Sequence, residues 1–218
     1  MTNLSTLGLL FCLTGATACG AEDTSQSSST TTDTTTSSST SPAVEQAGPY
    51  AVGHATVNVH DSVRDRDLRV EIWYPATEAA RAAADAGEPI EDFVPAGPER
   101  EELAGLVADA PDPGTSRTAH AARDADPAEG DPWATVAFSH CYNGTRYSTF
   151  SVAERLASHG VAVVAPDHTG GTLPDMPADN AAPLDTTFLQ TRAGDIEVVL
   201  DRVLDPGATE LPEALRGR

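Results

Sequence analysis

The side chains of this chain that could carry chemistry gather in two short polar stretches. Ser139, His140 and Cys141 follow one apolar run, and Asp167 and His168 follow another. Serine and cysteine can act as nucleophiles, histidine as a general base, and aspartate as the group that orients that base. Cysteine and histidine also bind metal ions. The two stretches therefore mark the expected functional site, with nucleophilic catalysis and metal binding as the chemistries to be weighed.

Residues 134–168 have the pattern of a strand, a polar loop, a helix and a second strand. The apolar runs begin at Ala134 and Val161, and a helical pattern leads to Gly160 between them. Parallel strands joined by a helix form a sheet with helices on its faces. Ligand chemistry in such sheets gathers at the carboxyl ends of the strands. We therefore predict an α/β fold in which residues 139–144 and 167–172 lie together.

Two further segments should extend and cover this sheet. Residues 52–61 and 68–74 alternate apolar and polar positions, and the charged residues between them predict an antiparallel hairpin. Residues 186–204 form a predicted helix capped by Asp185. Its apolar stripe consists of Leu189, Ala193, Ile196, Leu200 and Val203. Residues 211–218 are polar and are assigned to no element.

Residues 76–131 differ in composition from the rest of the domain. They are rich in Ala, Asp, Glu, Pro and Gly, with helical patterns near residues 77–86 and 99–110. A connection of this length inside a compact domain commonly serves as a lid or a binding loop. We therefore predict an insertion that partly covers the site.

The first 19 residues resemble a bacterial lipoprotein signal peptide. The apolar run from Leu7 to Leu13 is too short to span a bilayer, and Ala18 precedes Cys19 in a small-residue cleavage sequence. Cys19 would then carry the lipid and anchor the protein to a membrane. A plain secretory signal cut after Ala18 is the alternative. Either signal places the mature protein in the bacterial cell envelope, at the outer membrane or in the periplasm, or outside the cell.

Residues 20–48 are predicted to be a disordered tether. They consist largely of Ser and Thr, and such a segment cannot bury enough apolar surface to offset its conformational entropy. A tether after a lipid-bearing cysteine would hold the domain of residues 49–218 clear of the membrane surface.

The charge of the chain argues against nucleic acid as a partner. Asp and Glu outnumber Lys and Arg by 33 to 13, which gives a formal net charge of −20. Such a charge repels phosphate backbones.

Five short motifs resemble the α/β-hydrolase superfamily. The nearest branch is the platelet-activating-factor acetylhydrolases of the isoform II or plasma type, together with dienelactone-hydrolase-like bacterial esterases. The motifs are Trp73-Tyr74-Pro75, Phe138-Ser139-His140, Leu156-Ala157-Ser158-His159-Gly160, Ala165-Pro166-Asp167-His168 and Arg192-Ala193-Gly194-Asp195. The resemblance implies a serine carboxylic-ester hydrolase that uses no cofactor and acts on a small ester or a phospholipid-like substrate.

The resemblance also implies that part of the active site is missing from the chain. In that superfamily the nucleophilic serine lies on a Gly-x-Ser-x-Gly turn after the next strand, and the acid and the histidine follow it. The sequence contains no Gly-x-Ser-x-Gly. We therefore expect an incomplete hydrolase-type sheet, truncated before the nucleophile turn and inactive alone, with no member of the catalytic triad present.

The resemblance assigns the oxyanion-hole amide to Tyr142. It makes His140, Cys141, Asp167 and His168 residues that line the site, and His140 is expected to brace its own loop rather than act as the base. Cys141 stands where the family usually has Gly, which adopts positive φ more easily.

Other interpretations of these residues are weaker. Ser139 ends a strand without a glycine-flanked turn, so it is not expected to be the nucleophile. Cys141 has no evident base, and the closely spaced ligand pairs of a structural metal site are missing. Arg192 and Asp195, three residues apart on one helix, are interpreted as a structural ion pair. The alternative function is a non-catalytic surface lipoprotein with a degenerate hydrolase-like binding domain.

Overall fold

The computed structural model describes residues 44–109, 118–130, 133–176, 180–212 and 215–216. The predicted signal peptide, Cys19 and all but the last few residues of the tether lie outside this part of the chain. Among the described residues, no helix combines the length and the apolar character needed to cross a membrane.

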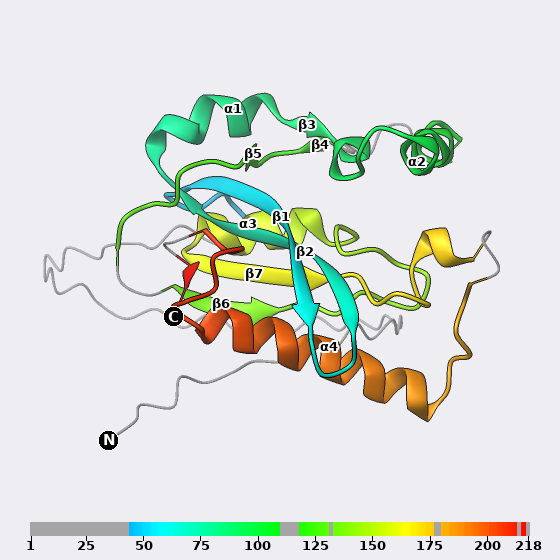
Figure 1. Cartoon of the computed structure of the whole chain (residues 1–218). Helices are drawn as coiled ribbons and strands as arrows, with labels where there is room; N and C mark the ends of the chain where they lie inside the picture. Colours follow the sequence, from blue (N-terminus) through cyan, green and yellow to red (C-terminus); the bar gives the residue numbers. More distant parts are fainter. Residues whose placement is uncertain (1–43, 110–117, 131–132, 177–179, 213–214, 217–218) are drawn as a thin grey trace, which may run out of the picture.

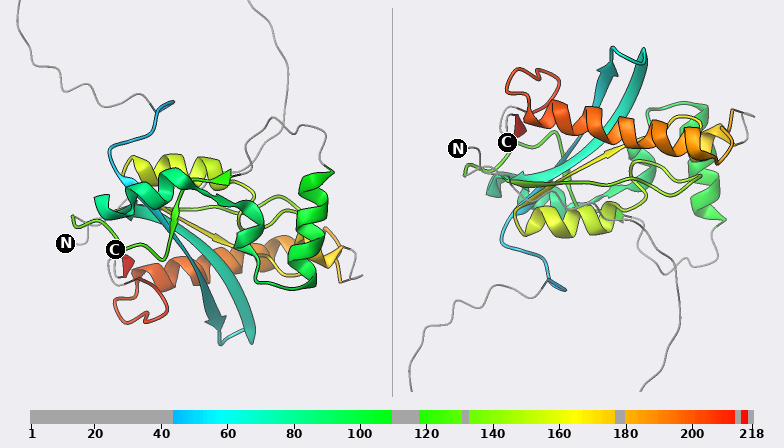
Figure 2. Two further views of the ribbon diagram at one scale, coloured as in Figure 1. Left: turned by 90° about the horizontal axis from the view of Figure 1, so that it is seen from above. Right: turned by 90° about the horizontal axis from the view of Figure 1, so that it is seen from below.

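Five strands form one mixed sheet in the order β5-β1-β2-β7-β6. They are β1 (Ala51–Asp61), β2 (Arg66–Ala76), β5 (Ala122–Arg123), β6 (Ala134–Ala137) and β7 (Val161–Pro166). β2 pairs antiparallel with β1 and β7, whereas β6 pairs parallel with β7 and β5 pairs parallel with β1. Helices α3 (Phe150–Ser158) and α4 (Thr186–Leu204) cover opposite faces (Figures 1 and 2). The predicted α/β architecture with helices on both faces is confirmed.

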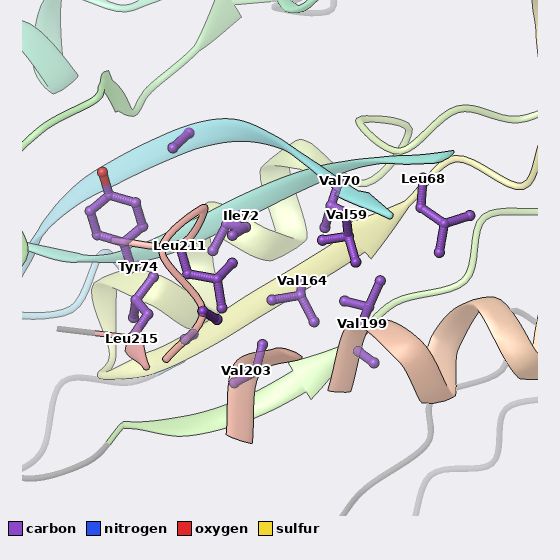
Figure 3. Packing of buried hydrophobic residues seen from close by; sticks show 14 of the residues in the cluster. Val59, Leu68, Val70, Ile72, Tyr74, Val164, Val199, Val203, Leu211 and Leu215 are labelled. Atoms are coloured by element: carbon purple, nitrogen blue, oxygen red, sulfur yellow. The ribbon is translucent and has the colours of Figure 1, made fainter. Parts of the chain in front are cut away.

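The predicted hairpin is present and slightly longer than its pattern indicated. β1 and β2 pair along their whole length, from Ala51 opposite Ala76 to Asp61 opposite Arg66. Side chains alternate between the two faces of a strand, so every second residue of β2 faces α4. These are Leu68, Val70, Ile72 and Tyr74, which lie in the cluster shown in Figure 3.

The core beneath α4 differs from the prediction in two respects. Leu211 and Leu215, assigned to a polar end, are buried beside Ile72 and Val164 in this cluster (Figure 3). The buried face of α4 is also rotated from the predicted stripe, because Leu189 is exposed. The buried residues are Phe188, Asp195, Ile196, Val199 and Val203. A carboxylate therefore lies on the buried face of this helix.

The opposite face of the sheet packs against α3 and part of residues 76–131. Trp73, Phe93, Tyr147 and Val163 belong to this second core, in which the rings of Phe93 and Tyr147 stack with centroids 5.3 Å apart. Aromatic stacking of this kind adds to the stability gained from area burial.

Residues 76–131 contain short elements rather than one continuous cover. These are the 3₁₀ turns η1 (Glu78–Ala80) and η2 (Ile90–Phe93), the helices α1 (Arg81–Ala86) and α2 (Pro98–Ala108), and the strands β3 (Glu88–Pro89), β4 (Thr118–Ala119) and β5. Because β5 pairs with β1, part of the predicted insertion belongs to the sheet. α2 lies beside Tyr147 and the 3₁₀ turn η3 (Leu173–Asp175).

A buried arginine connects the hairpin to the loops that follow β6 and β7. The Arg146 guanidinium lies 3.3 Å from Glu71 Oε2 and 2.8 Å from Asp167 Oδ2, and it also donates to the carbonyl of Phe93. The Arg146 amide donates to Asp167 Oδ1 at 2.6 Å. Arg146 and Glu71 are fully buried, so each charge depends on the others for compensation.

Replacement of Arg146 by methionine should be strongly destabilising. Methionine fills much of the space but leaves the carboxylates of Glu71 and Asp167 without their cation, and such a loss costs about 3–5 kcal/mol. Arg202→Met, which removes a half-exposed cation from surface ion pairs, should cost about 1 kcal/mol or less. Urea unfolding of both variants measures the difference, and equal losses would contradict the assignment.

Candidate active site

The loops after β6 and β7 lie side by side at one edge of the sheet, as predicted. Gly144 and Thr172 form a parallel β-bridge. The Asn143 amide donates to the Gly171 carbonyl at 2.8 Å, and the Leu173 amide donates to the Gly144 carbonyl at 3.0 Å. The two polar stretches of the sequence therefore form one continuous surface at the carboxyl ends of the strands.

Tyr142 is anchored by its side chain while its amide remains available. The hydroxyl donates to the Ala182 carbonyl at 2.6 Å, and the ring meets Phe188 of α4 edge to face. The amides of Asn143 and Gly144 donate within the loops. Within the described residues the Tyr142 amide has no hydrogen-bond acceptor. This donor is therefore unpaired within the described part of the chain.

The residue of this loop with a left-handed backbone conformation is Asn143, not Cys141. Asn143 has φ of 66°, and asparagine tolerates this region better than most residues. Cys141 is exposed and is not among the described residues with positive φ. The cysteine therefore occupies its position without the strain that its replacement of glycine suggested.

His140 braces its loop, in agreement with the role expected for it. Its Nδ1 lies 2.7 Å from the Cys141 carbonyl, and its Nε2 accepts the His168 amide at 3.0 Å. Since a carbonyl only accepts, Nδ1 carries the proton and the ring is neutral. Burial lowers the pKa of His140 to about 4, although the bond to the Cys141 carbonyl opposes this shift.

His168 is fully buried and takes its partner from α4 instead of from the neighbouring Asp167. Its Nδ1 lies 2.9 Å from Asp195 Oδ2, and its Nε2 lies 3.0 Å from Ser139 Oγ. Burial lowers the pKa of His168, and the hydrogen bond to Asp195 opposes this effect. Asp167 instead binds Arg146 and lines a polar cavity of about 200 Å³ with Thr145 and Thr172.

Asp195 has partners that the sequence interpretation did not assign to it. It is fully buried and meets two arginines at the end of the β1–β2 hairpin, with Arg64 Nη2 at 3.0 Å and Arg66 Nε at 3.1 Å. Burial alone would raise the pKa of Asp195, but hydrogen bonds from His168 and Arg66 lower it overall. The signal in the sequence that could have indicated its buried partners is an acidic residue on the apolar face of an amphipathic helix.

Arg192 also has partners outside its own helix. Its Nη2 donates to Ser139 Oγ at 2.7 Å and to the His140 carbonyl. Arg192 and Asp195 thus hold different parts of the two loops instead of serving mainly each other. The predicted ion pair between Arg192 and Asp195 is not among the ion pairs of the described residues.

The described residues contain no cluster of three or more His, Cys, Asp or Glu side chains placed to hold a metal ion.

Comparison with known proteins gives a likeness among solved structures. Neither a protein-family model nor a curated protein matches the chain. Among solved structures, the ferulic acid esterase from Streptomyces cinnamoneus is similar, with a TM-score of 0.52 and 27% sequence identity. The match covers 77% of this chain and 50% of the esterase chain, so this chain spans about half the length of that protein. The likeness supports an esterase or hydrolase type of fold and, at a coarse level, a hydrolase-like function.

The buried histidines predict a loss of stability in acid. The pKa of His140 is about 4 in the folded protein, whereas an unfolded imidazole titrates near pH 6.5. The unfolded state therefore binds the proton more tightly, and stability falls as the pH drops from about 6.5 to about 4. His140→Gln cannot take up this proton, so its stability should vary less over this range, by roughly 2–4 kcal/mol.

Glu154 should change the pH dependence of stability in the direction opposite to His140. Burial raises the pKa of Glu154 to about 7, partly offset by a hydrogen bond from the His120 amide. Its contribution to stability is present at low pH and is lost as the pH rises through about 7. Glu154→Gln should therefore steepen the loss of stability in acid. Urea unfolding at several pH values measures both variants, and the same pH dependence in wild type and His140→Gln would contradict the assignment.

Proposed function

We propose that this chain provides the oxyanion-stabilising half of a serine carboxylic-ester hydrolase active site. The observation that carries the proposal is the Tyr142 amide, which lies at the carboxyl edge of the sheet without an acceptor among the described residues. The similarity to an esterase supports the same class of chemistry.

In this proposal the nucleophile comes from a strand beside β6. β6 is an edge strand of the described sheet and pairs there only with β7, so its other edge can accept a strand. A serine at the carboxyl end of that strand would attack the acyl carbon near Tyr142. The Tyr142 amide would stabilise the oxyanion, a contribution of about 3–4 kcal/mol for one such donor. This chemistry requires no cofactor.

The proposed substrate is a small carboxylic ester. The comparison with a ferulic acid esterase favours esters of aromatic acids. The resemblance to acetylhydrolases and dienelactone hydrolases favours short acyl groups and phospholipid-like esters. In this proposal the insertion that contains α2 acts as a partial cover, because α2 lies beside Tyr147 and η3.

We also propose that Cys19 carries a lipid and that residues 20–48 tether the domain to the bacterial envelope. Stable anchoring generally requires more than one acyl chain, which a lipoprotein-type modification supplies. The proposed location is the outer membrane or the periplasm, with a secreted form as the alternative.

The function is tested by changing the Tyr142 amide in the product of the gene read beyond the Arg218 codon. Tyr142→Pro removes the N–H, and kcat for p-nitrophenyl acetate should fall about 10²–10³-fold. Tyr142→Phe keeps the amide and loses only the hydroxyl, so it is the matched control. Equal activities would contradict the role of the amide. A stop codon without a downstream Gly-x-Ser-x-Gly would favour the non-catalytic binding domain.

The anchor is tested by replacing Cys19 with alanine. Cells fed radiolabelled palmitate should label the wild-type chain and leave the variant unlabelled, and the variant should leave the membrane fraction. Cys141→Ala removes the exposed thiol of the folded domain and serves as the control. Labelling that survives in Cys19→Ala would sink the proposed anchor.

A further inference from the structure

Three side chains that are far apart in the sequence form a continuous hydrogen-bonded array. Ser139 Oγ lies 3.0 Å from His168 Nε2, and His168 Nδ1 lies 2.9 Å from Asp195 Oδ2. A nucleophile within reach of a base, with the base held by a carboxylate, is the geometry of a Ser–His–Asp triad, which is recognised by roles rather than by sequence order. We propose that Ser139 is a nucleophilic serine that accepts acyl groups, with His168 as its base and Asp195 as the orienting acid.

The proton positions in this array follow from the partners of each group. Asp195 faces Arg64 and Arg66 and is ionised, so both its oxygens only accept. His168 Nδ1 must therefore carry the proton, and Nε2 of the neutral ring is free to accept. Ser139 consequently donates its hydroxyl proton to Nε2. This is the protonation state from which a general base removes the proton of an attacking serine.

A cation lies beside the attacking oxygen. Arg192 Nη2 is 2.7 Å from Ser139 Oγ, and its guanidinium also binds the carbonyl of His140. Fixed positive charge at this position favours the negative charge that develops on Oγ as the proton leaves. The Arg192 contact also fixes the rotamer that points the hydroxyl at His168.

The burial of the array separates the reacting atom from the base. Ser139 and Arg192 are partly exposed, whereas His168 and Asp195 are fully buried. Ser139 is therefore the member of the triad nearer to solvent, while water is kept away from the pair that accepts and stabilises the proton. Low exposure strengthens the electrostatic interactions between His168 and Asp195.

The proposed reaction balances without another reagent. With an aryl acetate, Oγ forms a bond to the acyl carbon and the bond to the aryl oxygen breaks. The serine proton passes to Nε2 and then to the departing aryl oxide. Water hydrolyses the acetyl-serine to acetic acid and regenerates the hydroxyl. With a fluorophosphonate, Oγ bonds to phosphorus, fluoride leaves, and the serine proton is released to solvent, which gives a stable adduct.

The test is labelling of the full chain with a fluorophosphonate, followed by tryptic digestion and mass spectrometry. Ser139 is the one serine in the tryptic peptide of residues 124–146, so an adduct there is assigned by fragmentation. We expect labelling of the wild type at Ser139, none in Ser139→Ala, and unchanged labelling in Ser151→Ala, which removes an exposed serine of α3. An unlabelled wild type, or an adduct on Tyr142 instead, would overturn the proposal.

Two further measurements separate a reactive array from a structural one. Asp195→Asn should slow labelling about 10²-fold or more, because the imidazolium loses its counter-ion. In the wild type the labelling rate should fall in acid as His168 takes up a proton, and burial, which lowers the pKa of His168, shifts this fall to more acid pH than for an exposed imidazole. A rate that stays constant as the pH is lowered to the acid limit of the folded protein contradicts the base role, even where Asp195→Asn fails to fold. The Tyr142 variants are assayed in a Ser139→Ala background, where Ser139 cannot contribute to turnover of p-nitrophenyl acetate, so the two proposals can fail separately.

Discussion

The buried carboxylate of Asp195 is the constraint on which the rest of the site depends. It lies on α4, yet it is compensated by Arg64 and Arg66 from the β1–β2 hairpin and by His168 from the loop after β7. An unpaired buried carboxylate is costly, so these partners must arrive together for α4 to pack. Gly194 leaves room for the Arg64 side chain to reach Asp195, because a Cβ there would lie 2.8 Å from Arg64 Nη1. Helix position, hairpin position and loop conformation are thereby coupled.

The sequence predicted those parts of the structure that depend on local periodicity. The hairpin, α3, β7 and α4 all follow patterns within a few residues, and Asp185 caps α4 through the Phe188 amide as expected. The pairing of His168 with Asp195 joins positions 27 residues apart, and that of Arg66 with Asp195 joins positions 129 residues apart. No local pattern reports such contacts. For the same reason the sequence missed the two-residue β5 and the burial of Leu215.

The loop of residues 139–144 presents two chemistries that point to different roles. The Tyr142 amide is suited to stabilising an oxyanion formed by a serine from outside this loop. The Ser139 hydroxyl already has a base, an orienting acid and a cation around it. Both features depend on His140. Its ring donates to the Cys141 carbonyl and accepts the His168 amide, and its own carbonyl accepts Arg192. A loop with this many buried partners is held rigid before any ligand arrives, which reduces the conformational entropy that binding must remove.

The β1–β2 hairpin also has a consequence for the order in which the chain folds. Its partners are close in sequence, so the pairing of β1 with β2 closes only a short loop and is entropically inexpensive. β7 must then find β2 across about 90 residues, and β6 joins only through β7. The long hairpin is therefore a template on which the later strands assemble. In the transition state for folding, we infer native contacts concentrated in β1 and β2, while the parallel pairing that builds the candidate site forms last.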